Sequence, residues 1–169
     1  MRENSARRSA LVITLIALTV VLSPVYFPVG TTKCYPFQHM VNAIAGILLG
    51  PWVAAFMAIV TGTIRNMLGL GTVYAFPGGI PGGLVVGLVR RYLVKKDYAA
   101  LTEPLGTVVV GATLSAFIVA PLQGHALTWA FFWAAFGASS IPGSALGFLI
   151  LRIMRRRGLV ERLVQGPDR

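Results

Sequence analysis

Acidic residues and cysteine are scarce in this chain, which has five Asp and Glu residues and one Cys among 169. A single cysteine excludes an intrachain disulfide. Cys34 and His39 are too few for a zinc site, which usually takes about three or four ligands. The sequence also lacks a Walker A motif, a G-x-S-x-G elbow and an H-E-x-x-H helix, so it encodes no familiar ATPase, serine hydrolase or zinc protease. We therefore expect no enzyme, no metal and no cofactor.

Charged residues of either sign make up only 12% of the chain, whereas 56% of its residues are hydrophobic and the mean hydropathy is +0.74. A surface this apolar suits a bilayer better than water, so we predict a polytopic membrane protein. At about 20 apolar residues per crossing, the chain has room for roughly six spans. None alternates like a barrel strand, so we predict an all-α fold in one domain, 1–169. The predicted spans are 10–26, 37–50, 51–70, 76–93, 100–122 and 127–154.

The positions of Lys and Arg predict the orientation in the membrane. All but two of the 15 Lys and Arg residues precede the first span, separate spans four and five, or lie at or after the end of span six. With six spans these segments share one side, which the positive-inside rule makes cytoplasmic, so both termini are inside. The net charge of +10 then reflects topology and anionic-lipid contact, not nucleic-acid binding. A secretory signal is disfavoured, because no small-x-small cleavage site follows the first apolar run.

Polar side chains gather at the predicted outer face, in "TTKCYPFQHMVNAI" at 31–44. Gln38 and Asn42 are four residues apart and share one helical face. Arg65 and Asn66, at the outer end of span three, lie at the same level. Polar groups at membrane depth must face protein or a watery cavity, so we predict an outward-facing pocket. The nearby "FPGGIPGG" lacks a Walker pattern, and we interpret it as a helix-breaking outer loop with close backbone approach.

Several residues in or near this stretch have a second interpretation. Lys33 and Arg65 can snorkel to lipid headgroups. His39 and Asn42 can hydrogen-bond between helices, and Trp133 can belong to an interfacial aromatic belt.

The acids predict where the energy for transport comes from. All of them fall on or near the predicted cytoplasmic side, so a proton- or sodium-coupled carrier is disfavoured. If the protein concentrates a solute, a partner must supply the energy. The acids are Glu3, Asp97, Glu103, Glu161 and Asp168.

Two blocks, "LSPVYFPVGTTKCYPFQHMVNAIAGILLGPW" at 22–52 and "TGTIRNMLGLGTVYAFPGGIPGGLVVGL" at 61–88, resemble the ThiW-type substrate-binding (S) components of energy-coupling factor (ECF) vitamin transporters. The resemblance implies a multi-pass protein of a prokaryotic plasma membrane that captures a thiamine precursor, hydroxyethylthiazole. It also implies docking on a transmembrane scaffold driven by two cytoplasmic ATPases. Alternatives are an S component for another small vitamin or precursor, a non-transporting assembly protein, or an intramembrane enzyme using His39 or Cys34.

A small, nearly neutral heteroaromatic ligand needs aromatic walls and a few hydrogen-bonding groups. The cationic Arg65 fits less simply, and either binds an anionic or phosphorylated ligand or holds the outer loops by their backbone carbonyls. The other candidate ligand-binding residues are Tyr35, Phe37, Tyr74, Phe76, Trp133, Gln38, His39, Asn42 and Asn66.

Small residues on the first span form a candidate docking strip. Ala10, Thr14 and Ala17 follow one another at spacings of four and three, so they share a helical face that a partner helix can approach closely. Packing within the protein's own bundle explains the strip equally well. S components of the resembled family use Ala-x-x-x-Ala on this helix, which Ala6 and Ala10 match, whereas Thr14 interrupts the deeper strip.

Overall fold

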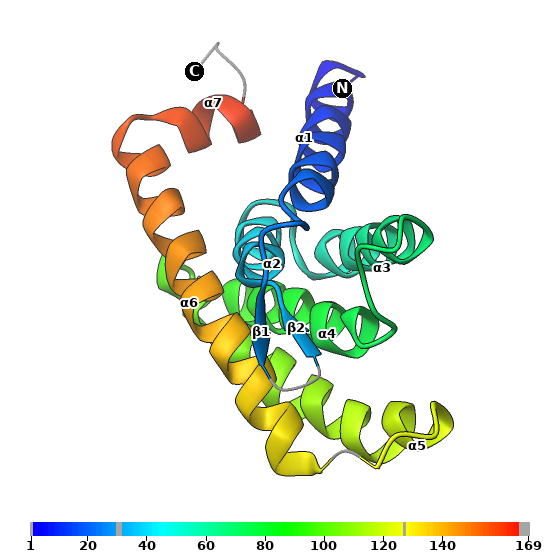
Figure 1. The fold of residues 1–169 in the computed structure, drawn as a ribbon. Coiled ribbons are helices and arrows are strands. Elements are labelled where there is room, and N and C mark those ends of the chain that lie inside the picture. The colour runs from blue at the N-terminus through cyan, green and yellow to red at the C-terminus, as the bar shows by residue number, and fades with distance from the viewer. Residues whose placement is uncertain (1, 30–31, 127, 166–169) are drawn as a thin grey trace.

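A computed structural model describes residues 2–29, 32–126 and 128–165 of the chain, so Leu127, where the sixth predicted span begins, and Asp168 lie outside the described residues. The fold is a helical bundle with one small hairpin (Figure 1), which confirms the predicted all-α class. The short helices η1, η3 and η4 are π-helical and η2 is a 3-10 helix. In chain order the elements are α1 (Arg2–Val21), β1 (Phe27–Val29), β2 (Thr32–Cys34), α2 (Pro36–Leu49), α3 (Pro51–Met67), α4 (Ala75–Leu88), η1 (Val89–Leu93), η2 (Asp97–Thr102), η3 (Leu105–Ala112), η4 (Ser115–Val119), α5 (Ala120–Leu122), α6 (Trp129–Arg156) and α7 (Leu159–Gln165).

Helices occupy each of the six apolar ranges that the hydropathy predicted. Among the described residues, two helical segments, Asp97–Leu122 and Trp129–Arg156, are both long and apolar enough to cross a membrane. Pro36–Leu49 is apolar but shorter. The number of crossings and the side of each terminus therefore stay predictions.

The first helix differs from its predicted bounds. It already includes Arg7 and Arg8 and it ends at Val21, five residues or so before the predicted end at Tyr26, because Pro24 cannot continue it. The chain then forms a hairpin in which β1 pairs antiparallel with β2, with Phe27 opposite Cys34.

The chain turns tightly at Gly50–Pro51, where the second and third predicted spans meet. Gly50 adopts a φ of 86°, which residues with a Cβ rarely tolerate, and Pro51 is the first residue of α3. Arg8 Nη2 donates to the carbonyl of Leu49 at 3.1 Å. This contact ties α1 to the carboxyl end of α2, where a cation is favoured by the helix dipole.

The "FPGGIPGG" segment is helical within α4, so its interpretation as a helix-breaking loop is wrong. The predicted close backbone approach is confirmed, because neighbouring helices leave no room for side chains on its glycines. A Cβ on Gly87 would lie 2.4 Å from the backbone of Pro51, and one on Gly83 would lie 3.1 Å from Ala54 Cβ. α4 therefore packs directly against α3 along its glycine face.

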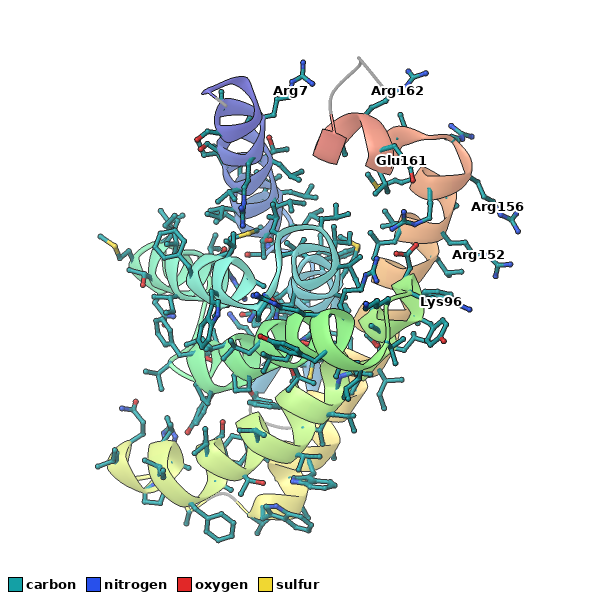
Figure 2. The ribbon with its side chains drawn as sticks, turned by 180° about the vertical axis from the view of Figure 1, so that it is seen from behind. Arg7, Lys96, Arg152, Arg156, Glu161 and Arg162 are labelled. Carbon is teal, nitrogen blue, oxygen red and sulfur yellow. The ribbon has the colours of Figure 1, made fainter. Side chains whose placement is uncertain are left out.

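Charge gathers at one end of the molecule. The start of α1 and helix α7 lie at this end (Figure 1), as do Arg7, Glu161 and Arg162, while Arg156, Arg152 and Lys96 follow along the same side toward the middle of the bundle (Figure 2). Arg155 bonds Asp97 Oδ1 at 2.7 Å and Glu161 Oε1 at 3.1 Å. These contacts join α6 to η2 and α7 at the charged end of the bundle.

Candidate functional site

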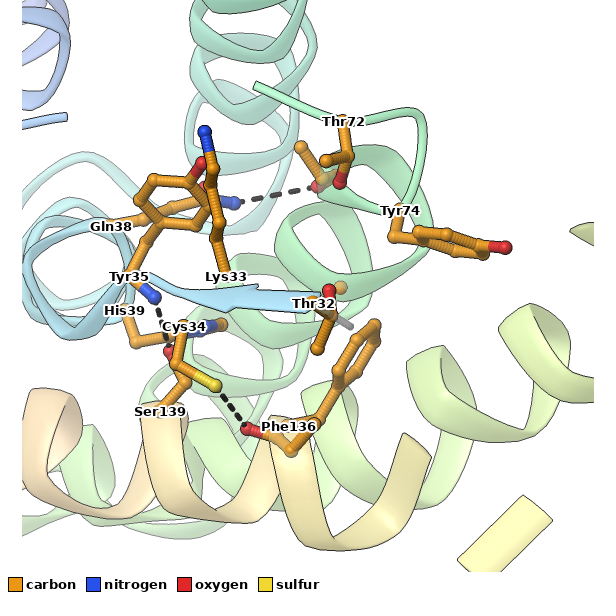
Figure 3. A pocket seen from close by; sticks show the side chains of 13 residues that line it. Thr32, Lys33, Cys34, Tyr35, Gln38, His39, Thr72, Tyr74, Phe136 and Ser139 are labelled. Carbon is orange, nitrogen blue, oxygen red and sulfur yellow. Dashed lines mark hydrogen bonds between the residues drawn. The ribbon is translucent and has the colours of Figure 1, made fainter. Parts of the chain in front are cut away.

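A small pocket lies beneath the hairpin, between β2 and the helices α2, α4 and α6 (Figure 3). It leaves about 30 Å³ for the centres of water molecules, which is room for roughly two waters. Aromatic and polar side chains alternate around it. The lining residues are Thr32, Lys33, Cys34, Tyr35, Gln38, His39, Thr72, Tyr74, Ala75, Gly78, Ala135, Phe136 and Ser139.

Two hydrogen bonds fasten the hairpin to α6 (Figure 3). The backbone N–H of Tyr35 donates to Ser139 Oγ at 2.8 Å, and the Cys34 thiol donates to the carbonyl of Ala135 at 3.2 Å. Burial raises the pKa of the Cys34 thiol to about 11, because a thiolate would lose its hydration there. The described strands of the hairpin are thus held over one side of the pocket.

Arg65 braces the wall of the pocket from behind. Its side chain is fully buried, its guanidinium lies 3.9 Å from the centroid of the Tyr35 ring, and its Nη1 donates to Gln38 Oε1. Within the described residues, Nε and Nη2 of Arg65 have no hydrogen-bond partner. Tyr35 in turn donates from its hydroxyl to the carbonyl of Leu70 at 2.8 Å. Arg65 therefore does not snorkel to lipid, and its described contacts are with pocket residues, not loop carbonyls.

A buried acid, Glu103, lies behind the floor of the pocket, where it contacts the lining residue His39. Glu103 is fully buried, and its Oε1 lies 2.8 Å from His39 Nδ1. Thr107 donates to the same oxygen at 2.7 Å and Asn42 at 3.4 Å. We expected every acid on or near the predicted cytoplasmic side, whereas Glu103 contacts His39 of the stretch that was predicted at the outer face. The short α2 lies beside the start of the helical segment Asp97–Leu122. His39 and Glu103, which were expected near opposite faces of the membrane, therefore touch.

Four of the predicted site residues, Tyr35, Gln38, His39 and Tyr74, line the pocket. Tyr74 packs its ring 5.0 Å from that of Phe132 and bonds His125 Nδ1 through its hydroxyl at 2.9 Å. Asn42 and Arg65 stand one layer behind the lining residues. Asn42 donates to the carbonyl of Gly79, and Arg65 donates to the lining residue Gln38.

Four other predicted residues do not reach the pocket. Phe37 packs against the main hydrophobic core, and Phe76 lies against Gly62 of α3. Trp133 stacks with Trp129, their ring centroids 4.6 Å apart. Asn66 donates to the carbonyls of Gly62 and Thr72 and so shapes the loop between α3 and α4.

α6 contributes pocket residues that were not predicted from the sequence, which gave only Trp133 from this helix. Phe136 and Ser139 are three residues apart on one face of that helix. The sequence shows this spacing, but many pairs of residues in α6 have the same spacing, so it did not single out Phe136 and Ser139. Glu103 had a clearer signal, since it is the one acid inside the predicted span 100–122.

The candidate docking strip on α1 faces outward. Ala10, Thr14 and Ala17 are all exposed, whereas Leu15 and Thr19 on the opposite face are buried. The strip therefore does not serve packing within the described bundle.

Comparison with known proteins identifies one family. No curated protein and no solved structure is detectably similar to the chain. The sequence model of one family, described as thiamine-precursor transporter protein (ThiW), matches residues 10–157. That match spans the hairpin, the pocket and every predicted membrane segment, and so the chain belongs to the ThiW family of thiamine-precursor transporter proteins.

Proposed function

We propose that this protein is the substrate-capture subunit of an ECF-type importer, and that its ligand is hydroxyethylthiazole. Its chain forms one domain, 1–169, that crosses a prokaryotic plasma membrane six times. The charged end of the bundle is cytoplasmic with both termini, because Lys and Arg are retained on that side. The hairpin and the pocket then face outward, where a nutrient is met.

The pocket under the hairpin is the observation that carries this proposal. Tyr35 and Phe136 provide aromatic walls, while Gln38, His39 and Ser139 provide hydrogen-bonding groups. This mixture suits a small heteroaromatic molecule with one or two polar substituents. The present space of about 30 Å³ is too small for such a ring, so the hairpin or the α3–α4 loop must move to admit it.

Energy for uptake comes from partners in this proposal. The chain has no Walker A motif, so it does not hydrolyse ATP by a familiar route. We expected no acid in the middle of the bundle, and that expectation spoke against ion coupling. It no longer supports an external energy source, because Glu103 is buried in the bundle. The exposed strip of Ala10, Thr14 and Ala17 supports it instead, since small residues on an unpartnered face allow a scaffold helix to approach closely.

An intramembrane enzyme using Cys34 and His39 has less support from the geometry. The Cys34 thiol donates to the carbonyl of Ala135, whereas a thiol activated by histidine would bond the imidazole. Burial also raises the Cys34 pKa to about 11, which is opposite to the lowered pKa of a nucleophilic cysteine.

Two measurements on the purified protein test the proposal. Mass spectrometry of extracts from gently purified protein should identify hydroxyethylthiazole, and calorimetric titration should show saturable binding of that compound. A different small vitamin or precursor in the extract would replace the ligand but keep the subunit assignment. The absence of any co-purified or titratable small molecule would favour a non-transporting membrane protein.

Reconstitution tests the energy source. In liposomes this chain alone should bind its ligand without accumulating it, and accumulation should require the scaffold, the ATPases and ATP. Concentrative uptake by the chain alone would contradict the S-component mechanism and point to ion coupling.

A further inference from the structure

Glu103 is the one fully buried acid among the described residues, and its hydrogen bonds are unevenly divided between its two oxygens. Oε1 meets His39 Nδ1 at 2.8 Å, the Thr107 hydroxyl at 2.7 Å and Asn42 Nδ2 at 3.4 Å. Oε2 has no partner within the described part of the chain. An ionised carboxylate can only accept hydrogen bonds, and three groups able to donate converge on this one oxygen.

Arg65 brings the opposite charge to the same buried region. It donates to Gln38, which shares a face of α2 with Asn42, and Asn42 bonds Glu103. One buried cation and one buried anion balance each other. A protonated His39 would add a second positive charge that no other buried acid in the described bundle offsets, and an uncompensated buried charge is costly. With His39 neutral, this buried region holds no uncompensated charge.

A neutral imidazole carries its hydrogen on only one nitrogen. Because Glu103 Oε1 is an acceptor, that hydrogen lies on Nδ1 of His39, and Nε2 is left with a free lone pair. No described residue bonds Nε2, and His39 lines the pocket. In this tautomer Nε2 is the nitrogen of His39 that is left to accept a hydrogen bond from a ligand in the pocket.

We propose that His39 Nε2 accepts a hydrogen bond from a hydroxyl group of the ligand, and that Glu103 is the positioning residue that holds His39 in this tautomer. The inference rests on the proposed function and narrows its ligand class to a small heteroaromatic molecule with a hydroxyl donor. A ligand that offered only a ring-nitrogen lone pair would face the lone pair of Nε2 and be rejected.

Selectivity between two ligands tests the role of Glu103. Unaltered protein should bind hydroxyethylthiazole about tenfold more tightly than its ethyl analogue, which lacks the hydroxyl. Glu103→Met removes the acceptor for Nδ1–H and should bring the two affinities close to equality. Glu103→Gln keeps an amide oxygen in that place and should retain the preference. A purely structural role would lower both affinities in parallel, so an unchanged ratio in Glu103→Met would overturn the inference.

Nuclear magnetic resonance tests the tautomer without altering Glu103. His125→Gln leaves His39 as the one histidine, since the chain has two, and ¹⁵N-labelled histidine then reports on His39 alone. At neutral pH the spectrum should show a protonated Nδ1 and an unprotonated Nε2, whose resonance shifts when hydroxyethylthiazole binds. A protonated Nε2, in either the other tautomer or the imidazolium form, would overturn the inference.

Failure of this inference is distinguishable from failure of the proposed function. Equal binding of both thiazoles by unaltered protein would overturn the role of His39 while leaving thiazole capture intact. If neither thiazole binds, the proposed ligand is wrong, and the inference falls with it unless the extracted ligand carries a hydroxyl and shifts the His39 resonance.

Discussion

The guanidinium of Arg65 lies over the ring of Tyr35, 3.9 Å from its centroid, and Arg65 also donates to Gln38. This arrangement packs a fully buried cation between an aromatic face and an amide oxygen. Cation–π contact and a charge-assisted hydrogen bond both strengthen when water is excluded. The wall of the pocket therefore depends on Arg65, although Arg65 itself does not line the cavity.

Removing the amide of Gln38 should destabilise the fold more than removing both that amide and the guanidinium of Arg65. Gln38→Ala leaves the buried guanidinium without its acceptor and should lower the free energy of unfolding by about 3 kcal/mol. The double variant Gln38→Ala/Arg65→Met removes the charge as well, while Met can still pack on Tyr35, and should recover more than half of that loss. Unfolding measured in detergent for both variants and for Arg65→Met completes the cycle. Additive losses would contradict this coupling.

Cys34 should report on opening of the hairpin. Its pKa of about 11, raised by burial from 9.0, keeps the thiol protonated at pH 8. Maleimide should thus label it about 100-fold more slowly than an ordinary exposed thiol. The rate should rise about tenfold per pH unit up to that pKa, and bound ligand should slow it further. Cys34→Ser/Gln123→Cys, which moves the thiol to an exposed loop, is the matched control. Equal rates for the two proteins would show that the hairpin does not shield Cys34.

A methyl group at Gly82 should disrupt the floor of the pocket. Its Cβ would lie 2.2 Å from Glu103 Oε1 and 2.5 Å from Thr107 Oγ1, so Gly82→Ala forces the buried polar cluster apart. We expect a loss of about 3 kcal/mol or more in unfolding free energy. Gly137→Ala is the control, because its Cβ would meet nothing closer than 3.9 Å and alanine favours a helix by about 0.5–1 kcal/mol. Equal melting temperatures for the two variants would contradict the packing argument.

Bulk on the exposed strip of α1 should uncouple transport from binding. Ala10→Leu or Ala17→Leu holds a partner helix away, at a packing cost of about 1–3 kcal/mol. Affinity for the ligand should be unchanged, while co-purification with the scaffold and ATP-dependent uptake are lost. Thr63→Leu adds similar bulk to an exposed position of α3 and should leave both intact. Normal coupling in the α1 variants would place the docking surface elsewhere.

The orientation of the bundle predicts where reporters are labelled. A reporter after Gly158, at the charged end, should be cytoplasmic, and one inserted within 26–33 should be outside, because Lys and Arg are retained on the cytoplasmic side. Enzymatic reporters active on only one side of the membrane distinguish the two. Labelling on the same side would rule out the six-crossing topology.

Hydropathy and charge by themselves determined the class of this protein. A chain this apolar must close its backbone hydrogen bonds within helices, and helices occupy each predicted range. The Gly50–Pro51 turn was also readable, since a positive φ and a proline at the first helical position are local requirements. Family membership followed from the order of motifs along the chain.

Only the tertiary structure decided which polar residues meet. Gln38 and Asn42 share a helical face by spacing alone, but the partners of that face come from segments far along the chain, 27 residues away for Arg65 and 61 for Glu103. The pairing of Glu103 with His39 depends on how far the short α2 overlaps the helical segment Asp97–Leu122. Gly82 of α4 leaves the space that Glu103 occupies there. Helical periodicity specifies a face of one helix, whereas the depth and rotation of neighbouring helices arise from packing of the whole bundle.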